Sequence, residues 1–280
     1  MILKSPIGSL ARRRLLSALA VAPLLCPLGA RAQSRSLVSR PEGGFRFLPG
    51  SPVFAGGAVA EPGFAIVHAL LSRWLPLEQG YELVERHLQS IGRPLQALCG
   101  MQLRLPRQLS IEEFTAFNAP YVSRLERWGV VQDRANPVSR TNVAPALAAP
   151  GEASLHAFTY AIPYGGPART FTMSGMTERG PGGNVTAQGD DSPEGMRSKL
   201  AYVIGAVGDR LAELGFGWSD ASHVELYSGV EIPGALATLA SRASGTLPRG
   251  VRWYYGRPPV SGLEVELEAR SVLREEVVEA

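Results

Sequence analysis

Two side chains of complementary chemistry lie close together in the C-terminal part of the chain. Arg249 and Glu264 are fifteen positions apart, on strand-like segments that follow each other directly. An arginine guanidinium presents two parallel donors that match a carboxylate, and a glutamate beside a bound water can act as a general acid or base. Together they could anchor a carboxylate-bearing substrate while a water molecule attacks it.

Other groups could complete such a site. The backbone N–H groups around Ser174 and Gly175 could polarise a developing negative charge. Arg140 opens a strand after a Pro-containing turn, as Arg249 does, and is a candidate for substrate binding. Tyr160 could stack on a ligand or hydrogen-bond to it, although a buried aromatic on a strand is commoner.

The histidines and cysteines do not indicate metal chemistry. The four histidines form neither an i, i+4 pair nor a His-Glu-x-x-His motif, and Cys99 is the one cysteine after residue 32. His156 is either a core histidine hydrogen-bonded between domains or a ligand-binding or acid–base group. The glycine-rich segment at 180–183 lacks the Lys and Ser/Thr of a phosphate loop. We therefore expect neither a metal nor an organic cofactor.

The composition is that of a globular protein, with 45% hydrophobic and 19% charged residues. It excludes collagen-like, disordered and multi-span membrane chains. The formal net charge is +3, but five basic and no acidic residues lie in residues 1–32. The remainder of the chain carries slightly more acidic than basic side chains. It lacks the positive excess that binding to phosphate backbones requires, so we expect no nucleic-acid partner.

Residues 1–32 have the pattern of an export signal. The arginines Arg12–Arg14 precede an apolar stretch, Leu15–Leu28, and Ala30-Arg31-Ala32 is typical of a cleavage site. The apolar stretch is shorter than the ~20 residues that span a bilayer. A twin-arginine signal and a general secretory signal both fit. We expect a periplasmic or secreted protein that has no membrane anchor after cleavage.

Strands and helices are expected to alternate in the same order in two halves of the chain. Hydrophobic periodicity in the first half predicts helices at 77–91 and 111–128 and strands at 64–74, 95–105, 140–146 and 153–162. In the second half it predicts helices at 193–214 and 233–242 and strands at 168–177, 223–230, 250–255 and 262–272. Ser110 with Glu113, and Ser192 with Pro193, are typical helix starts. Residues 33–60 are rich in Ser, Gly and Pro, which predicts a linker or an arm on the surface.

This order indicates a tandem duplication. The segment Leu88–Gly92 matches Leu211–Gly215 at an offset of 123, and Leu103 and Leu226 each lie eleven residues beyond the glycine. The two arginines that follow Pro-containing turns are related by an offset of 109. The smaller offset indicates a shorter second helix in the second copy.

Several short segments of the two copies match one family pattern. In the second copy they are Phe171–Gly175, Leu214-Gly215, Pro248-Arg249, Arg257–Pro259 and Leu263–Glu266. In the divergent first copy they are Phe117-Asn118-x-x-Tyr121, Pro137-x-x-Arg140 and Pro150. Their order and spacing resemble those of the Rid proteins (reactive intermediate deaminases, the YjgF-like family). The resemblance implies an α+β fold of two tandem Rid-like (chorismate-mutase-like) domains, each a β-sheet with two helices packed on one face. We expect these domains at 61–152 and 153–280.

The resemblance also implies trimer-like packing of domains in a homo-oligomer, with ligand clefts where copies meet. In that family, the arginine aligned with Arg249 grips the substrate carboxylate. The glutamate aligned with Glu264 handles the water that hydrolyses an imine to a ketone and ammonia. The family's asparagine is matched by Asn118 in the first copy and by no residue in the second. The glutamate position of the first copy falls on His156.

These observations predict an exported Rid-like protein that hydrolyses a small imine or enamine bearing a carboxylate to a carbonyl product and ammonia. Arg249 and Glu264 are the expected catalytic residues. The expected substrate-binding residues are Ser174, Gly175, Tyr160, Arg140, His156 and Asn118. Two alternatives stay open: a non-catalytic protein that binds a small carboxylate, and a chorismatase-like hydrolase, because chorismatases have a related tandem architecture.

Overall fold

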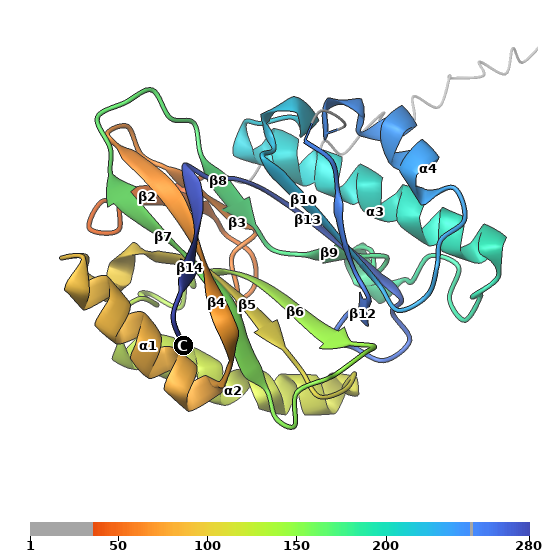
Figure 1. Cartoon of the computed structure of the whole chain (residues 1–280), viewed down its shortest axis with the longest axis horizontal. Coiled ribbons are helices and arrows are strands. Elements are labelled where there is room, and N and C mark those ends of the chain that lie inside the picture. Colours follow the sequence, from red (N-terminus) through yellow and green to blue (C-terminus); the bar gives the residue numbers. More distant parts are fainter. Residues whose placement is uncertain (1–35, 247–248) are drawn as a thin grey trace, which may run out of the picture. The chain divides into compact units, whose positions relative to one another are not determined.

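The computed structural model describes residues 36–246 and 249–280. The predicted export signal at 1–32 lies outside the described residues. Two β-sheets make up the described chain, and each carries a pair of helices on one face (Figure 1). This arrangement confirms the expected α+β fold of two Rid-like domains. Within the described ranges, no helix is both long and apolar enough to cross a membrane.

The first sheet has the strand order β12-β6-β5-β7-β4-β14. Its strands are β4 (Phe64–Pro76), β5 (Leu98–Arg104), β6 (Ser139–Pro145), β7 (Ser154–Pro163), β12 (Gly256–Arg257) and β14 (Arg274–Val278). Helices α1 (Leu77–Ser90) and α2 (Ile111–Arg127) cover its outer face. Alternate residues of the strands, such as Val67, Leu103 and Phe158, face the helices and form one hydrophobic core.

The second sheet has the strand order β1-β2-β3-β8-β13-β10-β11, and β9 also pairs with β13. Its strands are β1 (Val38–Arg40), β2 (Phe45–Leu48), β3 (Gly57–Ala60), β8 (Phe171–Met173), β9 (Met176–Thr177), β10 (His223–Ser228), β11 (Arg252–Tyr254) and β13 (Val265–Ser271). Helices α3 (Pro193–Leu214) and α4 (Ala235–Arg242) pack on it. Leu226 and Leu267 of the sheet meet Leu200 and Val203 of α3 in a second core.

The two long helices begin at the residues that the sequence predicts. Ser110 Oγ accepts a hydrogen bond from the Glu113 N–H at 3.1 Å, and Glu113 Oε2 accepts one from the Ser110 N–H at 2.8 Å. This capping box starts α2. Ser192 Oγ accepts from the Gly195 N–H at 3.1 Å at the start of α3. Gly215, with a φ of 83°, ends α3 in the left-handed conformation that glycine adopts readily.

Strands near the two ends of the described chain cross between the sheets. β1, β2 and β3 lie within residues 33–60, which we expected to be a linker or arm, and they join the second sheet through the pairing of β3 with β8. β14 runs parallel to β4 in the first sheet. The structure also corrects the boundary expected at 152/153, because β7 pairs with β4 and β5 and so belongs to the first sheet. Each sheet is therefore completed by strands from the other half of the chain.

The duplication is visible in the strand register. Gln102 of β5 pairs in parallel with Thr141 of β6. Glu225 of β10, at the predicted offset of 123 from Gln102, pairs in parallel with Arg252 of β11. The two positions on the neighbouring strands, Thr141 and Arg252, are therefore equivalent.

This register corrects two equivalences expected from the sequence. Arg140 comes directly before Thr141 on β6, whereas Val251 comes directly before the equivalent Arg252 on β11. The second copy therefore has no arginine at the position of Arg140, and Arg249 lies two residues away from it. His156 is the extra residue of a bulge, where the register of β7 with β5 shifts. His156 is therefore not structurally equivalent to a glutamate of β13 in the second copy.

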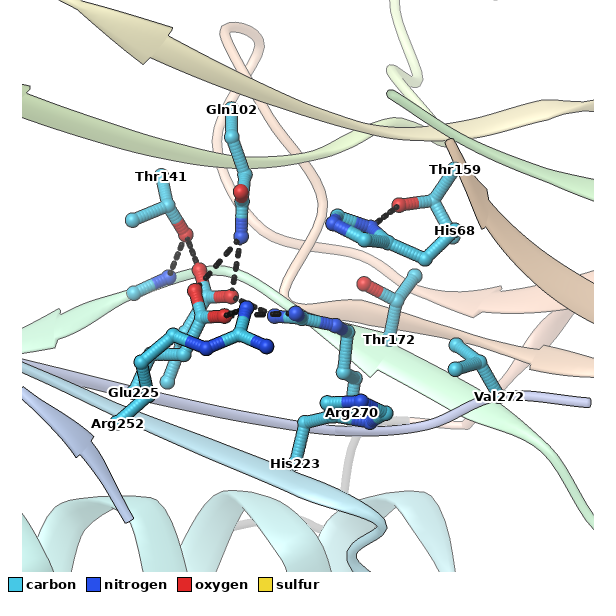
Figure 2. Close-up of polar contacts among 12 residues, drawn as sticks. His68, Gln102, Thr141, Thr159, Thr172, His223, Glu225, Arg252, Arg270 and Val272 are labelled. Carbon is cyan, nitrogen blue, oxygen red and sulfur yellow. Dashed lines mark hydrogen bonds and ion pairs between the residues drawn. The ribbon is translucent and has the colours of Figure 1, made fainter. Parts of the chain in front are cut away.

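The inner faces of the two sheets meet across a layer of polar and charged side chains (Figure 2). Arg270 of β13 donates from Nη1 to Glu268 Oε1 at 2.7 Å and from Nη2 to Glu225 Oε1 at 2.7 Å. Gln102 reaches across from the first sheet and donates to both carboxylates. Thr141 of β6 donates to Glu268. Hydrogen-bonded ion pairs therefore join the two sheets, and we call this group of residues the ionic layer.

Replacing Arg270 by methionine would remove the buried counter-charge that Glu225 and Glu268 share, and would leave Glu225 paired only with the exposed Arg252. We expect Arg270→Met to lower the free energy of unfolding by roughly 3–5 kcal/mol, the usual cost of breaking a buried ion pair. Urea denaturation followed by tryptophan fluorescence measures this change. The control is Arg274→Met, which removes an exposed pair with Glu276 and should cost less than about 1 kcal/mol. Equal losses in the two variants would contradict the role given to the ionic layer.

Candidate functional site

A cavity of about 300 Å³ lies between the two domains beside β6. The first domain contributes the start of α2 and part of β6, and the second contributes the segment that includes β9 and the residues from 259 to 266. Its lining includes the charged residues Arg140, Arg179 and Glu266, and also Gly175. The remaining lining is largely apolar, as is typical of small-molecule sites.

Arg140 is the buried cation of this cavity. The residue is 4% exposed, and its guanidinium carbon lies 4.5 Å from the ring centroid of Tyr121 and 5.7 Å from that of Phe114. Nη2 donates to Asn118 Oδ1, whereas Nη1 has no hydrogen-bond partner among the described residues. Burial lowers the pKa of Arg140 from its ordinary value, yet an arginine stays protonated at neutral pH. The cavity therefore contains a positive charge with an unused donor.

Two of the predicted substrate-binding residues position Arg140. Asn118, on α2, accepts a hydrogen bond from the guanidinium group. Ser174 Oγ accepts one from the Arg140 backbone N–H at 2.8 Å and donates to the carbonyl of Ala55 at 2.6 Å. Neither residue lines the cavity. Both fix the direction in which Arg140 points.

Glu266 presents a carboxyl group to the same cavity. The residue is 3% exposed, and its Oε2 atom has no hydrogen-bond partner in the described part of the chain. Burial, and to a lesser extent the neighbouring Glu268, raise the pKa of Glu266 well above its usual range. Glu266 therefore keeps its proton over a pH range in which an exposed glutamate is ionised, and it can act as an acid.

Gly175 gives Glu266 the space to reach the cavity. A Cβ atom at position 175 would lie 1.9 Å from Glu266 Oε1, so any side chain there displaces the carboxyl group. The Gly175 N–H donates to Thr141 Oγ1 at 3.1 Å, and the Ser174 N–H donates to the carbonyl of Gly56 at 3.2 Å. Both N–H groups are thus already used. This corrects the expectation that they stabilise a developing negative charge.

The structure does not bring Arg249 and Glu264 together. Arg249 Nη1 donates to the carbonyls of Ser219 at 2.9 Å and Ala221 at 3.0 Å, just before β10 begins. Glu264 lies beside the other end of β10 and accepts from Arg257 Nε at 2.8 Å. Neither of the two expected catalytic residues lines this cavity, whereas Arg140 and Glu266 do. Strand pairing between distant segments sets these positions, and it places the cavity at the arginine of the first copy.

Tyr160 and His156, both on β7, also lie outside the lining of this cavity. The Tyr160 hydroxyl donates to Glu276 Oε1 at 2.6 Å. Trp74 Nε1 donates to His156 Nδ1 at 3.1 Å, and burial lowers the pKa of His156 well below its ordinary value of 6.5. Of the two alternatives for His156, the structure favours a neutral core histidine.

Sequence reasoning did not single out several residues of the site. Glu266 stands two positions after Glu264, within a segment already matched to the Rid pattern. Phe54 lies in the stretch expected to be a linker, and Arg179 lies in the glycine-rich loop region. Glutamates alternate at positions 264, 266 and 268, and this pattern was the available signal in the sequence. It does not distinguish which of the three glutamates lines the cavity. Within residues 36–246 and 249–280, no group of three or more His, Cys, Asp or Glu is arranged to hold a metal ion.

The two buried histidines His68 and His156 predict a specific loss of stability in acid. Burial lowers both pKa values well below 6.5. As the pH falls through about 6.5, the unfolded chain binds protons that the folded protein does not, so stability decreases by roughly 1.4 kcal/mol per pH unit for each histidine. The decrease stops when the pH reaches the lowered values. Thermal unfolding measured in steps from about pH 7.5 to about pH 5.5 tests this sign.

His156→Gln is the matched variant, because a glutamine oxygen can still accept the hydrogen bond from Trp74. It should have a shallower pH dependence of stability than the unchanged protein. The same dependence in both proteins would show that His156 binds a proton in the folded state and is not the neutral core residue described above.

The model of a family described as 2-aminomuconate deaminase CnbZ matches residues 37–276. A 2-amino-5-chloromuconate deaminase of Comamonas testosteroni is 39% identical over 244 residues, which cover 84% of this chain and 96% of that protein.

Solved structures of similar architecture include a chorismatase, which is 15% identical with a TM-score of 0.46 and covers 78% of this chain and 77% of its own. The Rid protein YyfB of Yersinia pestis is 17% identical with a TM-score of 0.30, over 40% of this chain and 84% of that one. A YjgF/YER057c/UK114 family member of Mycobacterium tuberculosis is 19% identical with a TM-score of 0.27, over 37% of this chain and 79% of that one.

The family match covers nearly all of the described residues, and the resemblance to Rid proteins noted in the sequence is confirmed. The chain belongs to the Rid-like family described as 2-aminomuconate deaminase CnbZ.

Proposed function

We propose that this protein is a cofactor-independent hydrolytic deaminase for a 2-aminomuconate-type substrate, an unsaturated acid with an amino group beside one carboxylate. The observation that carries the proposal is one cavity lined by both Arg140 and Glu266, whose Nη1 and Oε2 atoms have no hydrogen-bond partner among the described residues. The deaminase family and the muconate named for the relative from Comamonas testosteroni support this choice of substrate.

Arg140 anchors the carboxylate next to the amino-bearing carbon. Its Nη1 donor is unused, and the surrounding aromatic rings exclude water from the guanidinium. A charge-assisted hydrogen bond in such surroundings is stronger than one in water. Asn118 and Ser174 hold the guanidinium in one orientation, so the reacting carbon is placed at a defined distance from Glu266.

Glu266 moves the protons. The acid form donates its proton to a carbon of the conjugated chain, and the enamine electron pair shifts to form an iminium double bond. The resulting carboxylate takes a proton from water as the water oxygen bonds to the iminium carbon. The hydroxyl proton of this adduct then passes to nitrogen, the carbon–nitrogen bond breaks, and ammonia leaves as the carbonyl forms. The sum is enamine plus water giving ketone plus ammonia, with no net oxidation.

Two expectations from the sequence stay as proposals. Residues 1–32 would direct export to the periplasm or out of the cell. The domains would associate further into a homo-oligomer with trimer-like packing. Both are separate from the chemistry of the cavity, which is formed within one chain.

Replacing Glu266 removes the proposed proton donor. We expect Glu266→Gln to slow ammonia release from 2-aminomuconate by at least about 100-fold, the usual contribution of a general acid–base group. In the unchanged protein, the rate should be retained below the raised pKa of Glu266 and fall as the pH rises through it. The variant should lack this fall. Ammonia release in a coupled assay, measured across pH, gives both results.

Glu264→Gln is the matched control, because Glu264 pairs with Arg257 and does not line the cavity. Its rate should stay within a few-fold of the unchanged protein. A Glu266→Gln variant with full activity would refute the role of Glu266. Tight binding of 2-aminomuconate by the unchanged protein without any ammonia release would favour a non-catalytic carboxylate-binding protein instead.

Gly175→Ala tests the position of the carboxyl group without changing any titratable residue. The added Cβ would lie 1.9 Å from Glu266 Oε1 and must displace it. A shift of about 1 Å in a catalytic group costs on the order of 100-fold in rate, so we expect a loss of that size in kcat. The control is Gly205→Ala on α3, where a Cβ meets no atom within 4 Å. It should keep full activity and gain about 0.5–1 kcal/mol of stability. Equal activity of the two variants would contradict the proposed contact.

A further inference from the structure

The cavity has a second arginine at its solvent side. Arg140 is 4% exposed, whereas Arg179 is exposed, and both line the cavity. One guanidinium therefore lies at the buried end of the cavity and the other at its opening. Positive charges at two ends of one cavity match a ligand with an anionic group at each end.

The walls between the two arginines are largely apolar. Phe54 and Phe114 line one part, and Val260 and Leu263 line another. A flat, unsaturated carbon chain can pack against these side chains, whereas a polar chain would lose its hydration without gaining hydrogen bonds. The cavity thus fits a linear hydrocarbon segment that carries its charges at the ends.

The backbone next to Arg179 is held firmly. Glu178 is fully buried, and its carboxylate accepts hydrogen bonds from the backbone N–H groups of Glu264 and Val265 at the start of β13. The Arg179 N–H donates to Thr177 Oγ1 at 3.3 Å, close to the point where β9 pairs with β13 (Figure 1). β13 also carries Glu266. The same strand therefore fixes the position of the Arg179 backbone relative to the proposed acid.

The Arg179 guanidinium makes no ion pair with a carboxylate of the described residues. Some other arginines do have such a partner: Arg197 pairs with Glu194 and Arg274 pairs with Glu276. A guanidinium that lines a cavity and has no such internal partner is available to an anionic ligand.

We propose that Arg179 binds the distal carboxylate of the substrate and so selects linear unsaturated diacids over monoacids. This inference rests on the proposed function for the placement of the first carboxylate at Arg140. It adds a residue that determines specificity and takes no part in the chemistry. A ligand lacking the distal carboxylate would occupy the same walls and the same Arg140 but gain nothing from Arg179.

Muconate and sorbate test this inference directly, because they share the same conjugated diene and differ in one end, a carboxylate in muconate and a methyl group in sorbate. Neither carries an amino group, so binding is measured without turnover. By isothermal titration calorimetry, the unchanged protein should bind muconate more tightly than sorbate. Arg179→Gln should weaken muconate binding by at least about 10-fold, as expected for the loss of a hydrogen bond to a charged group. Sorbate binding should change less than about 2-fold.

Two further variants complete the experiment. Arg179→Lys keeps the charge and should retain part of the preference for muconate. Arg197→Gln, at a partly exposed arginine on α3 outside the cavity, should retain all of it. Equal affinities of the unchanged protein for muconate and sorbate, or a preference that survives Arg179→Gln, would overturn the inference.

The outcome is separable from that of the proposed function. If Arg179→Gln abolishes the preference but the unchanged protein releases no ammonia from 2-aminomuconate, the diacid site stands and the deaminase proposal fails. If ammonia is released and the preference does not depend on Arg179, the deaminase stands and this inference fails.

Discussion

A buried carboxylate must either be paired with a cation or keep its proton, and this constraint governs the interior of the protein. Glu225 and Glu268 share the guanidinium of Arg270, and Gln102 and Thr141 supply further donors from the opposite sheet. Glu266 extends from the same strand but has an oxygen without a partner among the described residues. The layer that joins the two sheets therefore also produces, at its edge, a carboxylic acid suited to proton transfer.

The cation of the site, Arg140, is likewise buried, and it has no ion pair with a carboxylate of the described residues. Arg140 is surrounded by aromatic rings and by the amide of Asn118, which orient the guanidinium without neutralising it. A buried charge held in this way is costly to the free protein and favourable to an anionic ligand that pairs with it. Because the cation comes from the first domain and the acid from the second, the site requires both domains. Neither copy of the duplication contains it alone.

Local features of the fold followed from the sequence, whereas the pairing of distant residues did not. The caps at Ser110 and Ser192 depend on contacts within one helical turn, and their residue types identify them. Strands β1 to β3 are short and interrupted by Gly and Pro, and they exist because β8 offers them an edge more than a hundred residues away. The register of β6 against β5 likewise brings Arg140, and not Arg249, to the cavity that Glu266 of β13 also lines. Residue spacing along one strand cannot reveal such choices, since alternate positions share a face.

The parallel pairing of β4 with β14 has a consequence for biosynthesis. The paired residues of the two strands, such as Val67 and Arg274, lie 207 positions apart in sequence, and β14 is the outermost strand beside β4. While the ribosome is still translating the second domain, the edge of β4 offers unsatisfied N–H and C=O groups to any other extended chain. Folding with such long-range contacts is slow, so the nascent polypeptide passes through a period in which chaperone protection of that edge would prevent aggregation.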